Sequence, residues 1–401
     1  MMQNQEISKR KLLGISGLGW MFDAMDVGIL SFVLAALAVD WGLTSGQVGL
    51  IGSVNSIGMM VGAFFFGIMA DRVGRKNVFI ITLLLFSVGS GLSAFTTTLG
   101  AFLVLRFLIG MGLGGELPVA STLVSESVEA KERGKIVVLL ESFWAAGWIL
   151  AALIAYFVIP DYGWEAAMLL CAIPAFYALY LRLKLPDSPQ FIKAKKRKRH
   201  TIVQQITMVW APKYRRQTIM LWILWFCVVF SYYGMFLWLP SVMVMKGFDL
   251  IQSFKYVLIM TLAQLPGYFT VAWLIERAGR KMVLIVYLIG TALSAYFFGA
   301  ADSVSMLLIF GALLSFFNLG AWGALYAYTP EQYPGIIRGT GAGMAASAGR
   351  LGGIFGPMLV GTLVAQNYQT SSIFLVFCIT ILIGALAVGL LGKETKQTEL
   401  E

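Results

Sequence analysis

Charged residues are scarce in this chain of 401 residues. Asp, Glu, Lys and Arg together make up 12% of it, and hydrophobic residues make up 59%. Soluble chains average about 25% charged and about 45–50% apolar residues. A soluble protein of this composition has too little polar surface to cover itself. The composition therefore excludes a soluble enzyme, a disordered protein and a nucleic-acid-binding module.

Residues typical of metal and redox sites are equally rare. The chain has one histidine, His200, in a basic run, and three cysteines, Cys171, Cys227 and Cys378, in apolar runs without metal-ligand spacing. The odd cysteine number argues against a disulfide framework. No phosphate-binding Gly-x-x-x-x-Gly-Lys-Ser/Thr loop and no nucleophile with a partnering base is present in the sequence. We expect no cofactor, no metal and no enzymatic activity.

Long apolar runs dominate instead. A membrane-spanning helix needs about 20 mostly apolar residues, and helices satisfy their own backbone hydrogen bonds in lipid. The sequence predicts an all-α integral membrane protein with twelve transmembrane helices, at residues 13–38, 46–70, 78–97, 100–124, 136–158, 165–184, 218–244, 254–275, 282–300, 304–328, 340–365 and 370–391.

Basic residues are distributed unevenly between the predicted loops. With the N-terminus inside, 26 of the 30 lysines and arginines fall in the two tails and the cytoplasmic loops. The positive-inside rule then places both termini in the cytoplasm, in a multi-pass protein of the cell (plasma or inner) membrane. A basic cytoplasmic linker at 185–217 divides the chain into six-helix bundles at 1–184 and 218–401.

The two halves repeat at an offset of 205 residues. The offset aligns Gly42 with Gly247, Glu126 with Glu331, Arg133 with Arg338, and Asp71-Arg72-Val73-Gly74-Arg75-Lys76 with Glu276-Arg277-Ala278-Gly279-Arg280-Lys281. Parallel repeats of six helices imply two bundles related by an axis along the membrane normal. They also imply a substrate site between the bundles at mid-depth.

Several motifs resemble those of a known family. The segment Gly67-x-x-x-Asp71-Arg72-x-Gly74-Arg75-Lys76 is similar to the signature of the major facilitator superfamily. Two further segments resemble the helix 4 motif of its proton-coupled members and an element of its sugar-porter branch: Arg106-x-x-x-Gly110-x-Gly112-x-Gly114-Gly115-Glu116-x-Pro118 and Leu185-Pro186-Asp187-Ser188-Pro189-Gln190-Phe191. The last has Asp and Gln where that branch has Glu and Arg.

Three other segments resemble the metabolite:proton symporter group, and within it the bacterial nicotinate (niacin) transporters. They are Trp20-Met21-Phe22-Asp23-Ala24-Met25-Asp26, Glu141-Ser142-Phe143-Trp144-Ala145-Ala146-Gly147-Trp148 and Gly349-Arg350-Leu351-Gly352-Gly353. The resemblance implies a monomeric carrier in the lipid bilayer, with no nucleic-acid partner. It would import a small aromatic carboxylate with protons by alternating access.

A charge at bilayer depth costs about 2.5–3.5 kcal/mol, so intramembrane charges are candidates for function. Asp23 and Asp26 share a face of the first helix, and two carboxylates this close do not readily ionise together, which makes one a proton carrier. Arg106 resembles the arginine that pairs with a helix 1 acid in sugar:proton symporters, and a permanent structural pair is the alternative. The predicted proton-coupling residues are Asp23, Asp26, Arg106 and Glu141.

Arg350 lies among glycines, and its rigid guanidinium matches a carboxylate bidentately. Capture of an organic anion remains open, and so does an ion pair with Glu141 or another acid that holds the two halves together. Aromatic residues recur on helical faces, where they either stack a flat ring or simply pack. The predicted substrate-binding residues are Arg350, Trp144, Trp148, Asn318, Trp322, Tyr326, Tyr232, Tyr233 and Gln264.

Charged clusters at the cytoplasmic helix ends form a third set of candidate functional residues. In the resembling family, ion pairs between the two bundles close the cytoplasmic gate. The residues that correspond here are Asp71, Arg72, Arg75, Glu126, Arg133, Glu276, Arg277, Arg280, Glu331 and Arg338. Individual surface pairs are worth about 0–1 kcal/mol, which suits a latch that breaks in every cycle.

Other functions remain open at this point. A related symporter could carry another organic anion, such as a hydroxybenzoate or a sugar acid. A multidrug efflux antiporter has less need of an arginine that matches a carboxylate. A non-transporting sensor with a carrier fold is disfavoured, because the gate motifs and the intramembrane charges are all present.

Overall fold

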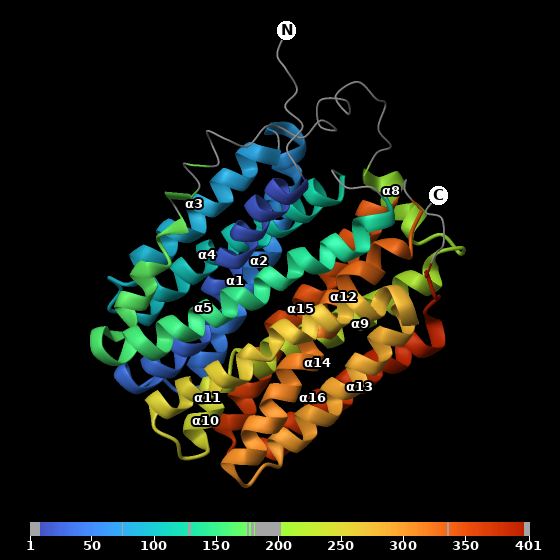
Figure 1. Cartoon of the computed structure of the whole chain (residues 1–401). Coiled ribbons are helices and arrows are strands. Elements are labelled where there is room, and N and C mark those ends of the chain that lie inside the picture. The colour runs from blue at the N-terminus through green and yellow to red at the C-terminus, as the bar shows by residue number, and fades with distance from the viewer. Residues whose placement is uncertain are drawn as a thin grey trace.

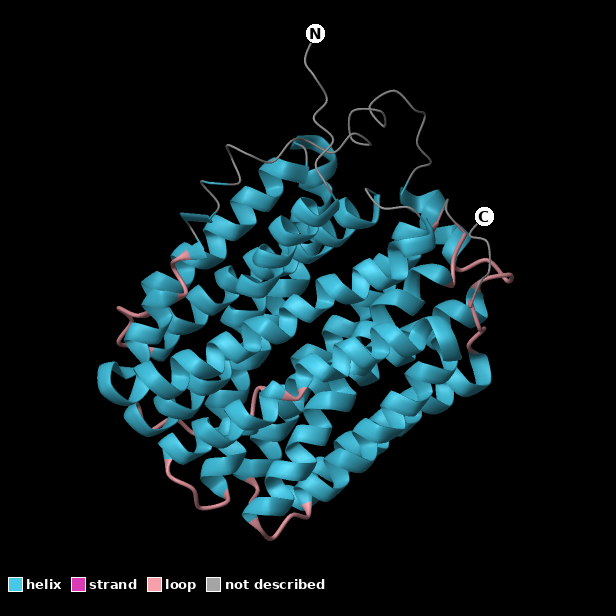
Figure 2. Cartoon of the chain, in the orientation of Figure 1, coloured by secondary structure: helices cyan, strands magenta, loops and turns pink. Residues whose placement is uncertain are grey.

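The computed structural model describes residues 9–73, 75–126, 130–174, 176–177, 180, 202–334 and 337–396. Over these ranges the chain forms helices joined by short loops, without strands (Figure 2). Eight helices are long and apolar enough to cross a membrane, and two shorter apolar helices, Asn77–Ser93 and Leu99–Gly115, accompany them. The prediction of an all-α membrane fold is confirmed.

The helices divide at the basic linker, most of which lies outside the described residues. The first half contains α1 (Lys9–Asp40), α2 (Ser45–Val73), α3 (Arg75–Ser93), α4 (Leu99–Glu126) and α5 (Ala130–Leu170). α8 (Ile202–Val209) lies in the described part of the linker. The second half contains α9 (Arg215–Phe236), α10 (Leu239–Met245), α11 (Leu250–Leu262), α12 (Gln264–Ala278), α13 (Arg280–Gly299), α14 (Val304–Glu331), α15 (Arg338–Ala365) and α16 (Thr370–Leu391).

Two of the predicted spans are broken. The span expected at 218–244 divides into α9 and α10 beside Pro240, which cannot donate a backbone hydrogen bond. The span expected at 254–275 divides at Ala263, three residues before Pro266. Between the fifth and sixth predicted spans the helix runs on, and Gly163 interrupts it with a φ of 80° and a ψ of 169°. Only glycine adopts such a conformation without strain.

The 205-residue offset reappears in the helix boundaries. α1 and α10 end at Asp40 and Met245, and α2 and α11 begin at Ser45 and Leu250. The ends of α2 and α12, and the beginnings of α3 and α13, follow the same offset. Gly42 and Gly247 both have positive φ, at 60° and 96°. The loops of the two halves therefore share their turn geometry as well as their length.

Each half packs by the same scheme. In the first half α1 packs on α5, and α4 packs on α2 and α3; in the second α9 packs on α15, and α14 packs on α12 and α13. Figure 1 shows the first-half helices together on one side of the molecule and α9 to α16 on the other. Across the boundary α2 lies against α15, and α5 lies against α11 and α12.

Close contact between α2 and α15 occurs at one end of these helices. The Ser53 hydroxyl donates to the Ile354 carbonyl at 2.7 Å. A Cβ on Gly49 would lie 2.8 Å from the Pro357 carbonyl oxygen, and one on Gly361 would lie 2.6 Å from that of Ser45. Small residues let the two backbones approach, as is usual between membrane helices.

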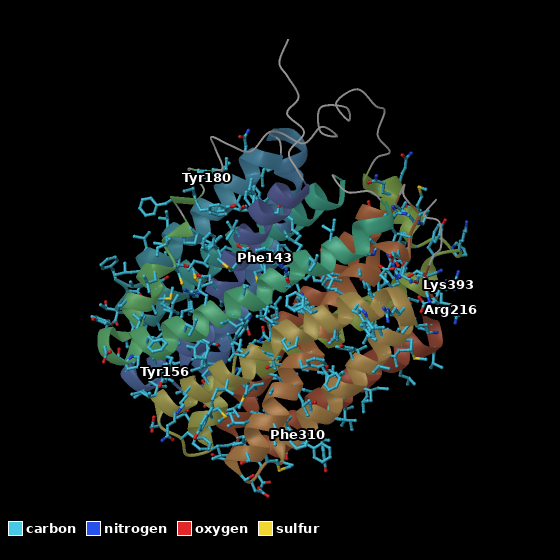
Figure 3. The ribbon with its side chains drawn as sticks, in the orientation of Figure 1. Phe143, Tyr156, Tyr180, Arg216, Phe310 and Lys393 are labelled. Carbon is cyan, nitrogen blue, oxygen red and sulfur yellow. The ribbon has the colours of Figure 1, made fainter. Side chains whose placement is uncertain are left out.

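In the N-terminal half of α15, residues on this same helix face are exposed. Gly343 and Ser347 are exposed, although helical geometry places them on the same face as Ile354 and Pro357. A Cβ on Gly343 would meet nothing within 4 Å. The two halves thus meet where α10 and α11 lie. Toward the end that carries α8, α15 no longer contacts α2 closely, whereas α5 still lies against α12 (Figure 1). Arg216 and Lys393 lie at that same end (Figure 3).

Candidate functional site

The first-half charges form a buried ion pair. Asp26 on α1 and Arg106 on α4 approach with 3.5 Å between Oδ2 and the guanidinium, and neither side chain has any exposed surface. The Ser90 hydroxyl on α3 donates to the other Asp26 oxygen. Arg106 also lies 3.4 Å from the Met168 sulfur and 5.3 Å from the centroid of Phe102. All three helices around Asp26 belong to the first half.

Asp23, one turn earlier on α1, has different surroundings. It is buried and interacts electrostatically with the Tyr233 hydroxyl on α9 in the second half. The same hydroxyl interacts with Arg350 on α15. Of the two acids expected to act together, Asp26 therefore pairs within the first half, whereas Asp23 lies close enough to the second half to act electrostatically on Tyr233.

Glu141 lies at the boundary between the halves. It is fully buried on α5, and the indoles of Trp20 and Trp322 lie beside its carboxyl group. No hydrogen-bond partner for either Glu141 oxygen, or for those two indole N–H groups, occurs among the described residues. The Tyr268 hydroxyl and both polar atoms of the Gln264 side chain, on α12, are likewise buried without a partner there. Buried polar groups with so few partners call for an explanation, which makes Glu141 and its polar neighbours a candidate site.

Aromatic rings form a continuous cluster next to Glu141. We define the central aromatic cluster as Trp20, Trp144, Trp148, Trp225, Tyr232, Trp322 and Tyr326, from α1, α5, α9 and α14. Trp144 and Trp322 stack with 6.4 Å between centroids and a 19° interplanar angle. Tyr232 lies 4.8 Å from Trp322 and accepts a 2.7 Å hydrogen bond from the Trp144 indole. The cluster therefore joins the two halves.

Arg350 borders this cluster. Its guanidinium is 3.4 Å from the Tyr233 hydroxyl and 3.7 Å from the Met59 sulfur. Tyr233 in turn lies 5.1 Å from Tyr232, centroid to centroid. An ion pair of Arg350 with Glu141, the alternative to anion capture, does not occur among the described salt bridges. Asn318 is buried on α14, with its side-chain oxygen unpartnered in the described part of the chain.

The predicted gate is only partly described. The side chains of Asp71, Arg72, Arg75, Glu126 and Arg133 lie outside the described residues. In the second half Arg280 pairs with Glu276 at 3.0 Å and with Glu331 at 3.2 Å. Arg277 lies over the Trp273 ring at 4.1 Å. Arg338 donates to the Pro330 and Tyr333 carbonyl oxygens. These contacts lie within one half, and the expected pairing between halves stays a prediction.

Sequence reasoning missed an acid at the C-terminal end of this cluster. The Glu394 carboxylate accepts hydrogen bonds from the backbone N–H groups of Arg280 and Lys281, at 2.9 and 3.0 Å. The Thr395 hydroxyl donates to Glu331 at 2.5 Å. Acids stabilise helix N-termini, so Glu394 fixes the start of α13. The sequence does contain a signal for this acid, because Glu394-Thr395-x-Gln397 repeats the order of Asp187-Ser188-x-Gln190 in the first half.

Sequence reasoning also left out Trp20, Ser90 and Tyr268, which line the two charged sites. Each stands on an apolar helix, where a lone polar or aromatic residue gives no signal until its neighbours are known.

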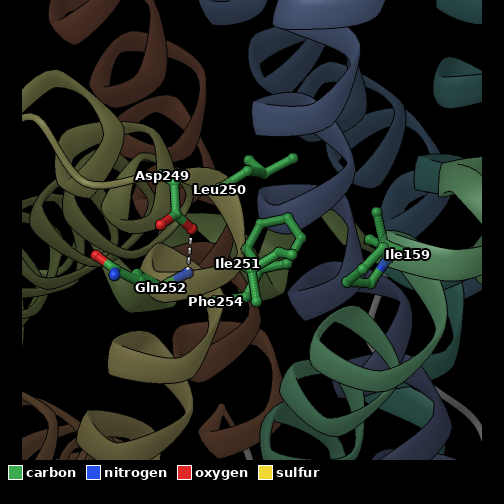
Figure 4. A pocket seen from close by; sticks show the side chains of 7 residues that line it. Ile159, Asp249, Leu250, Ile251, Gln252 and Phe254 are labelled. Atoms are coloured by element: carbon green, nitrogen blue, oxygen red, sulfur yellow. Dashed lines mark hydrogen bonds between the residues drawn. The ribbon is translucent and has the colours of Figure 1, made fainter.

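A surface pocket does form elsewhere, between Ile159 on α5 and Leu250 and Phe254 on α11 (Figure 4). It contains none of the predicted site residues.

Comparison with known proteins agrees with this architecture. The model of the family described as Major Facilitator Superfamily matches residues 17–264 and 255–400. A Bacillus subtilis protein, whose name proposes it as a niacin/nicotinamide transporter, is 68% identical over 100% of both chains. The niacin transporter NiaP of Acinetobacter baylyi is 47% identical over 97% of this chain and 95% of that protein.

Solved structures show the same fold. The E. coli xylose transporter XylE, in a partially occluded inward open conformation, superposes with a TM-score of 0.79. The alignment covers 97% of this chain and 99% of XylE, at 18% identity. The family model and the two sequence relatives each span nearly the whole chain. The chain therefore belongs to the major facilitator superfamily, and it is a multi-pass membrane transporter rather than an enzyme.

Proposed function

We propose that this transporter imports nicotinate together with protons. The observation that carries the proposal is Arg350, 3.4 Å from Tyr233 and next to an aromatic cluster that joins the two halves. A guanidinium binds a carboxylate bidentately, and large aromatic side chains pack against a flat ring. The names of the two relatives, niacin/nicotinamide transporter and niacin transporter, support the same solute.

Trp144, Trp322 and Tyr232 are the residues we assign to the pyridine ring. Their rings lie within 6.5 Å of one another, and Trp144 and Trp322 are nearly parallel. Trp148, Tyr326, Asn318 and Gln264 complete the proposed substrate site. Glu141 lies beside this ring site, so it either takes the coupled proton or contacts the ring nitrogen.

Proton coupling is supported by the buried pair of Asp26 and Arg106. An uncompensated buried charge is expensive, so protonation of Asp26 would require Arg106 to find another partner or to move. In this scheme a proton on Asp26 loosens α4 from α1, and its release restores the pair. Asp23 and Glu141 are the two other acids that could carry the proton.

Alternating access is supported by the uneven contact between α2 and α15. They meet through Ser53 and Ile354, whereas Gly343 and Ser347 on the same face of α15 are exposed. We propose that the chain works as a monomer in the cell membrane with both termini in the cytoplasm. On that orientation the bundles at 1–184 and 218–401 meet on the outside through α2 and α15 and lie apart there on the inside, while α5 and α12 stay in contact. The predicted gate residues would close the cytoplasmic side.

Uptake of labelled nicotinate into proteoliposomes tests the proposal. We expect accumulation driven by an inward proton gradient and abolished by a protonophore. Arg350→Lys keeps the charge but loses the fork geometry, and we expect it to weaken nicotinate binding at least tenfold. Uptake without accumulation would refute symport and leave a facilitator. Absence of nicotinate uptake, in a preparation that transports another organic anion, would refute nicotinate as the substrate.

A further inference from the structure

Three hydrogen-bond donors converge on one methionine at the boundary between the halves. The Met59 sulfur on α2 lies 4.0 Å from Nδ2 of Asn55, 3.7 Å from the Tyr233 hydroxyl and 3.7 Å from the Arg350 guanidinium. Asn55, Met59 and Tyr233 are each at most 3% exposed. The donors come from α2, α9 and α15, so both halves contribute.

A thioether is a poor acceptor for this set. Methionine sulfur accepts hydrogen bonds weakly, whereas hydrogen bonds to an ionised group are about twice as strong as neutral ones. Ser56 follows Asn55 on α2. It is buried, and its hydroxyl has no partner among the described residues. Its oxygen would lie 3.2 Å from a Cβ on Gly353, next to Arg350 on α15. Polar groups buried without adequate partners are costly and call for an explanation.

We infer that Asn55, Ser56, Tyr233 and Arg350 form a carboxylate subsite, in which the Met59 sulfur holds the place of a carboxylate oxygen. The inference rests on the proposed function and adds the α2 residues that would recognise the anion. The guanidinium of Arg350, 3.4 Å from the Tyr233 hydroxyl, is the cation that the subsite offers to an anion.

The position of the subsite fits an aromatic acid. Tyr233 lies against Tyr232 with 5.1 Å between centroids, and Tyr232 contacts Trp322 at 4.8 Å. A carboxylate held by Asn55 and Arg350 thus places an attached ring toward the central aromatic cluster. Because Ser53, two residues before Asn55, already joins α2 to α15, a bound anion extends that contact between the halves.

Equilibrium binding to the purified full-length protein tests the subsite, with labelled nicotinate as the probe and with nicotinamide and benzoate as competitors. Asn55→Leu removes one donor, and we expect nicotinate and benzoate affinity to fall roughly 10- to 100-fold, with nicotinamide affinity changed less than threefold. Met60→Leu, at the next position of the same helix and outside the subsite, is the matched control and should bind nicotinate within about threefold of wild type.

Met59→Glu gives the sharpest outcome, because an internal carboxylate would occupy the subsite. We expect a folded protein that no longer binds nicotinate. Wild-type nicotinate affinity in Asn55→Leu, or in a folded Met59→Glu variant, would overturn the subsite. If wild type binds benzoate but not nicotinate, nicotinate is not the substrate. The subsite is then tested by measuring the binding of labelled benzoate to the same variants. If wild type binds neither acid, both inferences are wrong.

Discussion

Replacing Asp26 by Asn removes the charge from the buried pair while nearly preserving its shape. The atoms of the pair are 3.5 Å apart and fully buried, and an effective dielectric constant near 20 gives an attraction of about 5 kcal/mol. Removing one partner of such a pair usually costs about 3–5 kcal/mol, because the remaining charge is uncompensated. We therefore expect Asp26→Asn to melt at a clearly lower temperature than wild type.

Transport assays on Asp26→Asn distinguish a role of the pair in proton coupling from a role in substrate passage. In proteoliposomes we expect Asp26→Asn to exchange labelled nicotinate across the membrane within about threefold of the wild-type rate, and to lose accumulation driven by a proton gradient. Asp40→Asn is the matched control on the same helix, because Asp40 is exposed and its carboxylate accepts a 3.2 Å hydrogen bond from the Trp164 indole. Wild-type accumulation in Asp26→Asn would refute the role of the pair. Loss of exchange as well would assign the pair to substrate passage.

Two further predictions concern helix ends and helix contacts. Gly279 has a φ of 93°, and its Cβ would lie 2.5 Å from the Glu394 carboxylate, whereas a Cβ on Gly343 would meet nothing within 4 Å. Gly279→Ala should therefore lower the melting temperature more than Gly343→Ala, and equal melting would contradict the strain. Gly361→Leu should push α2 away from α15, because a Cβ at position 361 would lie 2.6 Å from the Ser45 carbonyl oxygen. Spin labels at the exposed residues Val39 and Tyr368 should then move apart, and an unchanged distance would contradict a closed contact there.

The sequence predicted the helices well because lipid imposes one simple requirement on them. Runs of about 20 apolar residues must become helices in a membrane, whatever their neighbours. Pro240 and Ala263 show the limit of this reasoning, since the helices there break inside continuous apolar runs. A proline in a membrane helix can kink it or end it, and the packing of neighbouring helices decides which.

The candidate site was predictable only through its charges. Asp26, Arg106, Glu141 and Arg350 stand out because each charge in an apolar run is costly and needs a reason. The residues that contact these charged groups are not distinguished in this way by the sequence. Asn55, Ser90 and Met59 are unremarkable in sequence. They gain meaning only because the fold brings Ser90 to Asp26, and brings Met59, with Asn55 beside it, to Tyr233 and Arg350.

α1 links the two charged sites. Asp26 pairs with Arg106 inside the first half, and Asp23, three residues earlier, acts on the Tyr233 hydroxyl of the second half, which also binds Arg350. The two carboxylates move together because they share a rigid helix. If a proton on Asp26 loosens α1 from α4, the same shift changes the distance of Asp23 from Arg350. An anion at Arg350 is then favoured in one protonation state, and this differential affinity is what thermodynamic coupling between proton and substrate requires.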